Sequence, residues 1–146
     1  MLTKLESNLI SRYWEDIDAA LRASVPPLAD ATDDALNNIH TRLLQDNMQA
    51  WALVDMQEEN TRVYALVITT IWEDPGTADR NLLIYALYGY NKIEEIMWKD
   101  GLETLKKYAK GTHCRAIVAL TSVKRIKDVV ESLGGDASTY FITLEV

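Results

Sequence analysis

The chain has 146 residues, a length that fits one domain with a substantial buried core. Its hydrophobic fraction of 48% is typical of a globular protein and argues against disorder. A net charge of −7 disfavours general binding to nucleic acid, and no apolar run is long enough to span a membrane. The single cysteine, Cys114, excludes an intrachain disulfide and indicates a reducing compartment, so we expect a cytoplasmic protein.

Two helices are predicted before residue 47. Thr3 and Glu6 form a capping-box pattern, which predicts a helix over 3–25 that ends at a pair of prolines. A second helix is predicted over 32–46, with acidic residues in its first turn. The apolar stripe of the first helix comprises Leu5, Leu9, Tyr13, Ile17 and Leu21, widened by Ile10, Trp14 and Ala20.

Three strands are predicted next, because β-branched and aromatic residues become frequent. They cover 48–56, 62–72 and 82–90, and turn-forming residues separate them at 57–61 and 73–81. Short connections of this kind predict an antiparallel meander.

Helices and strands alternate in the rest of the chain. A helix is predicted over 93–110, a strand over 114–122, a helix over 123–133 and a last strand over 138–146. The strand at 82–90 and the strand at 114–122 flank a helix, so they should lie parallel with a right-handed crossover. The predicted order is ααβββαβαβ, an α+β fold.

This order resembles the fold of the GNAT (Gcn5-related N-acetyltransferase) family. The local similarity lies in LETLKKYAKGTHCRAIVALTS (102–122) and VKRIKDVVESLGG (123–135), and the order of elements agrees over 32–146. The resemblance implies one GNAT-like domain over 1–146 with a mixed, centrally splayed sheet. The family's first strand is expected to be missing, with an added helix over 1–25 in its place.

GNAT enzymes hold the pyrophosphate of coenzyme A with an R/Q-x-x-G-x-G/A loop at the start of the central helix. Glycines there let the backbone approach the phosphates, and the free N–H groups of the helix point at the anion. The resemblance places this loop on Ile93, Glu94, Glu95, Ile96, Met97 and Trp98. The loop has no glycine, and two carboxylates stand where phosphates would bind. A carboxylate and a phosphate about 5 Å apart repel each other by about 3 kcal/mol. We therefore expect the loop to be degenerate and to bind no cofactor.

The resemblance also implies a tyrosine general acid in the helix after the fifth family strand. Its position is taken by Val130, which cannot transfer a proton. Tyr85, Tyr88 and Tyr90 lie on or after the preceding strand and are expected to be core residues. No catalytic residue is therefore predicted.

His113 and Cys114 are adjacent, but a zinc site needs four ligands and the sequence does not complete one. No metal site is predicted. Cys114 is expected to be a small buried side chain at the start of a strand. A second possibility, a thiol nucleophile with a separate histidine beside it in space, stays open.

The function predicted from these features is a non-catalytic GNAT-like module for interaction or assembly. The resemblance extends to small tailed-phage proteins, which implies a virion or connector-associated role and a virion location. Tyr13, Trp14, Ile17 and Leu21 are the candidate interface residues for a protein partner or for self-association. The alternative is an N-acyltransferase that uses acetyl-CoA with a divergent loop. A small-molecule sensor using the gap between the strands at 82–90 and 114–122 is a third hypothesis.

Overall fold

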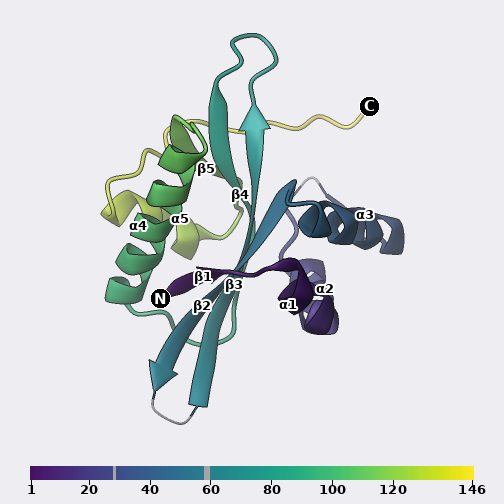
Figure 1. Cartoon of the computed structure of the whole chain (residues 1–146). Coiled ribbons are helices and arrows are strands. Elements are labelled where there is room, and N and C mark those ends of the chain that lie inside the picture. Colours follow the sequence, from purple (N-terminus) through teal and green to yellow (C-terminus); the bar gives the residue numbers. More distant parts are fainter. Residues whose placement is uncertain (28, 58–59) are drawn as a thin grey trace.

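The computed structural model describes residues 1–27, 29–57 and 60–146, so residues 58–59 of the turn predicted at 57–61 lie outside it. Figure 1 shows helices on both sides of one sheet. In chain order the elements are β1 (Leu2–Lys4), α1 (Ser7–Arg12), α2 (Trp14–Arg22), α3 (Asp33–Leu44), β2 (Met48–Gln57), β3 (Asn60–Glu73), β4 (Arg80–Gly89), α4 (Glu95–Gly111), β5 (Ala116–Ala119) and α5 (Lys124–Ser132).

The sheet has five strands in the order β1-β2-β3-β4-β5. The strands β2, β3 and β4 form the predicted antiparallel meander. The strand β5 lies parallel to β4, and α4 makes the crossover between them. The predicted α+β class with a mixed sheet is confirmed. Among the described residues, no helix combines the length and the apolar content that crossing a bilayer requires.

The N-terminal end of the chain differs from the prediction. Residues 2–4 form β1, the strand expected to be missing, and Thr3 pairs with Ala52 in the sheet. The predicted helix over 3–25 is instead two helices that meet at Tyr13, and the first begins after Glu6 without a side-chain cap. Thr3 is therefore a strand residue, because pairing with β2 satisfies its backbone better than the start of a helix would.

The C-terminal end also differs. The strand predicted over 114–122 is limited to Ala116–Ala119, and α5 is the last regular element. Residues 138–146, predicted as a strand, form neither a helix nor a strand and pair with no described strand. Their alternating pattern is that of a strand, yet the described chain gives them no neighbour to pair with.

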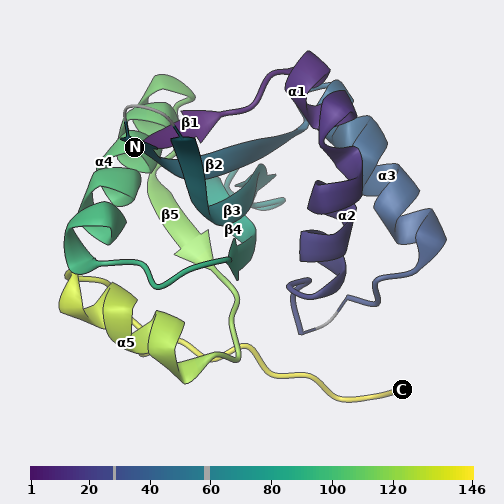
Figure 2. The ribbon, with the colours of Figure 1, turned by 90° about the horizontal axis from the view of Figure 1, so that it is seen from below.

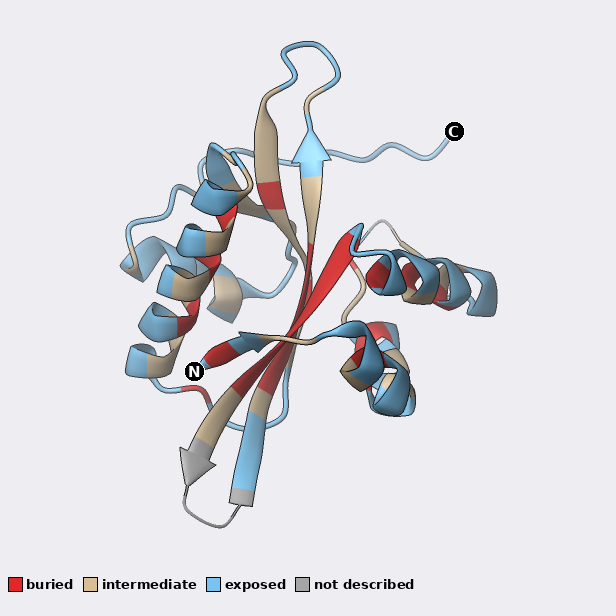
Figure 3. Cartoon of the chain, viewed as in Figure 1, coloured by how far each residue is buried: buried red, intermediate tan, exposed pale blue. Residues whose placement is uncertain are grey.

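Two apolar clusters cover the two faces of the sheet. On one face α1, α2 and α3 pack against the sheet, and this cluster, the α1–α3 cluster, includes the fully buried Leu21 and Leu36. On the other face α4 packs against β2, β3 and β4, and this α4 cluster includes Trp51 and Leu82. Figure 3 shows the buried residues concentrated in the middle of β2 and β3 and on the inner sides of the helices.

Candidate functional site

A β-bulge interrupts β4 at Tyr85. Ala86 pairs with Ile68 of β3, and Ile84 pairs with Thr69, so Tyr85 is an extra residue with no partner in the ladder. A bulge bends the strand that contains it and increases its twist. The strand β4 therefore changes direction at this residue.

The side chains around the bulge confirm its position. Ile84 and Leu87 pack against the α4 cluster, whereas the successive residues Tyr85 and Ala86 both face the α1–α3 cluster. Two neighbouring side chains can share one face of a strand only where its alternation is broken.

The pairing between β4 and β5 ends at this bulge. Asn81–Ile84 of β4 pair with Ala116–Ala119 of β5, and no described strand pairs with that side of β4 beyond Ile84. We call residues 85–89 the open β4 edge. An open edge offers backbone N–H and C=O groups to an extended ligand.

The helix α4 begins a few residues after this edge. Its N-cap residue, Glu94, makes no side-chain hydrogen bond to the helix, and its carbonyl accepts from the N–H groups of Met97 at 3.0 Å and Trp98 at 3.1 Å. Within the described chain, the N–H groups of Glu95 and Ile96 have no acceptor. Free N–H groups at the positive end of a helix dipole are suited to binding an anion such as a phosphate.

Half of the loop predicted to be degenerate is directed into the core. Ile93 is 8% exposed, and Met97 and Trp98 pack against the α4 cluster. Their bulk therefore anchors α4 to the sheet and does not cover the free N–H groups. Ile96 is 72% exposed, so its side chain leaves the first turn of the helix open to solvent.

Cations lie close to the two acids of the loop, Glu94 and Glu95. The Glu95 carboxylate lies 3.2 Å from the Lys99 ammonium one helical turn later, which offsets its charge in part. Lys92, in the loop before α4, is exposed and adds a second cation nearby. Glu94 lines a hollow beside the helix. The repulsion expected between these acids and a diphosphate is therefore weaker than their positions in the sequence suggest.

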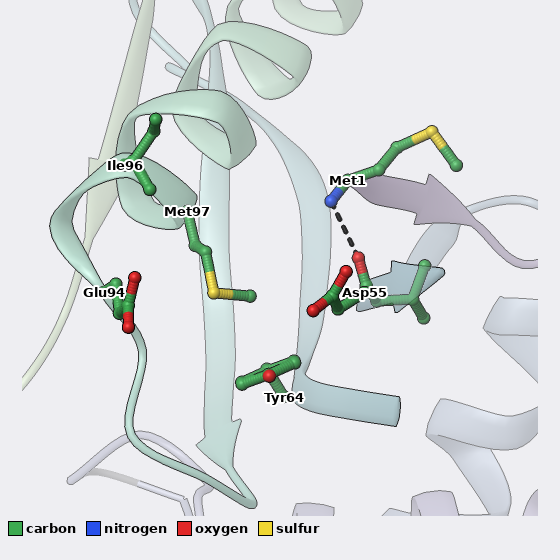
Figure 4. A pocket seen from close by; sticks show the side chains of 7 residues that line it. Met1, Asp55, Tyr64, Glu94, Ile96 and Met97 are labelled. Carbon is green, nitrogen blue, oxygen red and sulfur yellow. Dashed lines mark hydrogen bonds between the residues drawn. The ribbon is translucent and has the colours of Figure 1, made fainter. Parts of the chain in front are cut away.

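The hollow beside α4 has a volume of about 380 Å³. Figure 4 shows Glu94 and Met97 on its helix side, with Asp55 and Tyr64 across from them. It is lined by Met1, Val54, Asp55, Tyr64, Glu94, Ile96 and Met97. Because two carboxylates line it, this hollow suits an anion poorly, and an anion would bind instead at the free N–H groups of α4.

Three tyrosines lie on the open β4 edge or next to it. Burial raises the pKa of Tyr85, and Tyr85 and Tyr88 pack against the α1–α3 cluster. The pKa of Tyr90 is also raised, first by burial and then by the charges of Asp16 and Tyr88. The hydroxyls of Tyr85 and Tyr90 are therefore protonated at neutral pH, as tyrosines ordinarily are, and the raised pKa makes each a weaker acid than a tyrosine in water. The expectation that all three are core residues is too simple, since Tyr90 is 45% exposed.

Other predicted residues have structural positions. Ile17 and Leu21, two of the interface candidates, are buried in the α1–α3 cluster, while Tyr13 is exposed. Trp14 stacks on His40 with the ring centroids 3.9 Å apart. Val130, at the family's tyrosine position, lies partly exposed on α5.

His113 and Cys114 do not form a site with other ligands. The backbone of His113 has a φ of 61°, which turns the chain between α4 and β5. The Cys114 sulfur lies 3.5 Å from the Thr112 hydroxyl and packs at the rim of the α4 cluster. The described part of the chain brings together no group of three or more His, Cys, Asp or Glu side chains that could hold a metal ion.

Comparisons with known proteins give similarity in structure but not in sequence. No protein-family model matches the chain, and no curated protein matches it. The aminoglycoside N-acetyltransferase AAC(6')-Iy, solved with a bisubstrate analogue, matches with a TM-score of 0.71 and 12% identity over 100% of this chain and 97% of that one. A predicted acetyltransferase from Clostridium acetobutylicum, solved with acetyl-CoA, matches with a TM-score of 0.68 and 18% identity over 99% and 95% of the two chains.

A ribosomal-protein-alanine N-acetyltransferase from Brucella melitensis biovar Abortus 2308 is also similar. Its TM-score is 0.66 and its identity 12%, over 100% of this chain and 99% of that one. At identities this low, the three similarities show a shared fold, and they cover 99–100% of this chain and 95–99% of the other chains.

These comparisons correct two predictions. The non-catalytic module was the wrong main interpretation, because the similar structures are acetyltransferases and favour the alternative of an acyltransferase. The prediction of no cofactor was also wrong, because similar structures contain coenzyme A or acetyl-CoA. The physical reason is that a loop without glycine can still present free N–H groups when its bulky side chains turn into the core. The described elements and these comparisons together show that the chain has a GNAT-like fold.

Proposed function

We propose that the chain is an N-acyltransferase that takes an acyl group, such as acetyl, from acyl-CoA and transfers it to an amine. The observation that carries this proposal is the pair of free N–H groups at the start of α4, next to the open β4 edge. The bound coenzyme A and acetyl-CoA in similar structures support it.

The residues present fit an acyl-CoA in two places. The N–H groups of Glu95 and Ile96 can donate to the diphosphate, and Lys92 before the helix and Lys99 one turn into it add cations nearby. The extended, amide-containing arm of the coenzyme can hydrogen-bond to the open β4 edge as an added strand would.

Acyl-CoA supplies a thioester whose carbonyl carbon is attacked by the amine nitrogen. Backbone N–H groups of the open β4 edge can donate to the negative charge that develops on the carbonyl oxygen. The amine attacks in its neutral form, so a protonated acceptor first loses a proton to water. The C–N bond forms and the C–S bond breaks, the departing sulfur gains a proton, and the proton that the nitrogen loses returns through water to the group that supplied it. Tyr85 is our candidate to supply that proton, because it lies where the pairing of β4 with β5 ends and its hydroxyl is protonated at neutral pH.

An acidic surface favours a cationic acceptor. Asp16 of α2 acts on Tyr90 at the end of the open β4 edge, and the whole chain carries a charge of −7. Such a field attracts protonated amines to the site. Aminoglycosides and peptides that begin with alanine, the substrate classes in the names of two similar structures, are therefore suitable first acceptors.

Binding is tested by the thermal stability of the chain with acetyl-CoA. A ligand at 100 times its dissociation constant stabilises a protein by about 2.7 kcal/mol, so we expect a clear rise in melting temperature. Ile96→Pro removes one free N–H at a helix position where proline is tolerated, and it should weaken binding by roughly 10- to 100-fold. Ile96→Ala keeps the N–H and serves as the matched control.

Catalysis is tested by following free thiol released from acetyl-CoA in the presence of each acceptor. Tyr85→Phe should lower kcat by roughly 100-fold or more while leaving KM for acetyl-CoA nearly unchanged. A chain that is not stabilised by acetyl-CoA, or that releases no thiol with any amine, would contradict the proposed function.

A further inference from the structure

The hollow beside α4 has no part in the reaction proposed above. It lies between the first turn of α4 and the region where β2 ends and β3 begins (Figures 1 and 2). Among the described residues that line it, none belongs to the open β4 edge, where we place the thioester. Its volume of about 380 Å³ is at the lower end of the range for small-molecule sites, which is roughly 300–1,000 Å³. The hollow is therefore large enough for a small ligand of its own.

A second β-bulge directs Tyr64 toward the hollow. Leu53 pairs with Ala65 and Val54 pairs with Val63, so Tyr64 is an extra residue of β3 with no partner in the ladder. A bulge of this kind turns a side chain out of the regular alternation. Figure 4 shows the Tyr64 ring at the hollow, across from α4. The aromatic ring is therefore held there by the geometry of the strand.

Carboxylates stand on both walls of the hollow. Figure 4 shows Glu94 on the helix side and Asp55 on the strand side, with the thioether of Met97 between them. The Glu94 carboxylate makes no hydrogen bond or ion pair with a described residue. The Met1 ammonium at the rim already donates to a carbonyl of β2 at 2.8 Å and lies 3.5 Å from Asp100. Negative charge therefore predominates in the hollow.

These walls select the chemistry of a ligand. An anion would be repelled, and an uncharged apolar molecule would remove water from the carboxylates without replacing its hydrogen bonds. The described residues bring together no group of three His, Cys, Asp or Glu side chains that could hold a metal ion. An ammonium on an apolar chain meets both requirements, because its charge suits the carboxylates and the aromatic ring while its chain suits the apolar side chains.

We propose that the hollow binds a small amphiphilic amine, a molecule that carries an ammonium on a short apolar chain. The ammonium lies between Glu94 and Asp55, and the apolar chain packs against Met97 and the ring of Tyr64. The sequence analysis treated Glu94 only as an obstacle to a diphosphate. This amine is distinct from the amine that is acylated, and its binding does not depend on the proposed acyltransferase activity.

An amine in the hollow should also strengthen the binding of coenzyme A. Glu94 belongs both to the hollow and to the start of α4, where we place the diphosphate. An ammonium beside Glu94 offsets part of the repulsion between this carboxylate and the diphosphate. The coupling is reciprocal, so coenzyme A should strengthen the binding of the amine by the same factor. This second step rests on the proposed function, because it uses the diphosphate site described there.

Binding is tested by NMR on the full chain with ¹³C-labelled methionine methyl groups, titrated with hexylamine. The methyl signals of Met1 and Met97, which line the hollow, should shift. The signal of Met48, which is buried in the α1–α3 cluster, should stay in place. Hexan-1-ol has the same apolar chain without the charge and should bind at least roughly 10-fold more weakly. Unmoved signals of Met1 and Met97, or equal binding of the alcohol, would overturn the proposal.

The role of the carboxylate is tested in two variants. Glu94→Gln removes the charge at the hollow and should weaken hexylamine binding by roughly 10-fold. Glu95→Gln is the matched control, because Glu95 is the next residue, pairs with Lys99 and does not line the hollow. Its affinity for hexylamine should equal that of the unchanged chain. An unchanged affinity in Glu94→Gln would show that the amine does not bind as proposed.

The coupling is tested by calorimetric titration of coenzyme A, which has the diphosphate but no acyl group to transfer. Saturating hexylamine should tighten its binding by roughly 5-fold or more in the unchanged chain and leave it unaltered in Glu94→Gln. Equal affinities with and without hexylamine would refute the coupling. A chain that binds no coenzyme A under either condition would contradict the proposed function and the coupling together, while the methionine signals decide the hollow independently.

Discussion

The sheet from β1 to β4 and the region that begins at β5 are built in opposite ways. The first has helices on both faces, and its fully buried side chains include Leu21, Ile68 and Leu82. The second contains a four-residue strand, a helix without a buried side chain and a C-terminal segment, residues 138–146, with exposed apolar side chains. The bulge at Tyr85 lies at the boundary between them.

The difference shows which apolar surfaces the chain covers with its own residues. The part before β5 buries apolar residues on both faces of its sheet against its own helices. From β5 onward the apolar side chains recur as they do in buried elements, but no described residues pack over those of α5 and residues 138–146 to bury them. The open β4 edge therefore offers unpaired backbone groups to a ligand, and the apolar side chains of residues 138–146 are exposed.

The largest expected difference between the two regions is in hydrogen exchange. Amides of α5, which has no buried residue, should exchange with an opening free energy near zero. Amides in the middle of β3 should approach the free energy of global unfolding, which is about 5–15 kcal/mol for a protein of this kind. Equal protection of α5 and β3 would show that the two regions do not differ in local stability.

Truncation of buried and exposed side chains should differ nearly as much. Leu21→Ala removes a side chain with 0% exposure and should lower the free energy of unfolding by about 2–5 kcal/mol. Val130→Ala on α5, where the side chain is 41% exposed, should cost less than about 1 kcal/mol. Urea denaturation of the two variants measures both values, and similar losses would remove the distinction.

A buried hydrogen-bonded group between β2 and β3 should show a smaller effect. Thr69 is fully buried, accepts from Trp51 Nε1 at 2.9 Å and donates to Gln49 Oε1 at 3.0 Å. Thr69→Val leaves both partners without this contact and should cost about 1–3 kcal/mol in urea denaturation. The neighbouring Thr70 donates to the Asn47 carbonyl near the surface, so Thr70→Val is the control and should cost less.

The smallest expected effect concerns the turn between β3 and β4. Hydrogen bonds from the N–H groups of Thr77 and Gly76 lower the pKa of Asp74 below its usual 3.8. Because the folded state has the lower pKa, this carboxylate stabilises the protein above pH 3.8, and the stabilisation disappears as the pH falls through the lowered value. The difference in stability between the unchanged chain and Asp74→Ala should therefore shrink on acidification from pH 5 to pH 3. A constant difference over that range would rule out this contribution.

Most of the fold could be predicted because its signals are local. The meander follows from β-branched residues and turn clusters, and the crossover follows from the order strand, helix, strand. The strand β1 was missed because Thr3 and Glu6 also match a capping box, and a pattern in the sequence cannot show that β2 has a free edge beside it. The last strand was predicted from a correct pattern in residues 138–146, but pattern alone does not supply a pairing partner.

The candidate site could not be predicted in the same way. Glu94, Glu95 and Ile96 were judged by their size and charge, while the free N–H groups depend on the direction of each side chain. The bulge at Tyr85 gave no signal either, because LLIYALYGY is apolar almost throughout and a break in alternation is invisible in it.

That bulge also has a consequence for how the site could be lost. Removing Tyr85 would leave Ile84 followed by Ala86, and every remaining side chain of β4 would keep the face it has now. Without the bulge, β4 could pair along its whole length with the chain that follows β5. The open β4 edge would then be closed while the core stays intact. A deletion of one amino acid would thus leave the protein able to fold but unable to bind a ligand at this edge. An enzyme could lose its activity in this way and keep its structure.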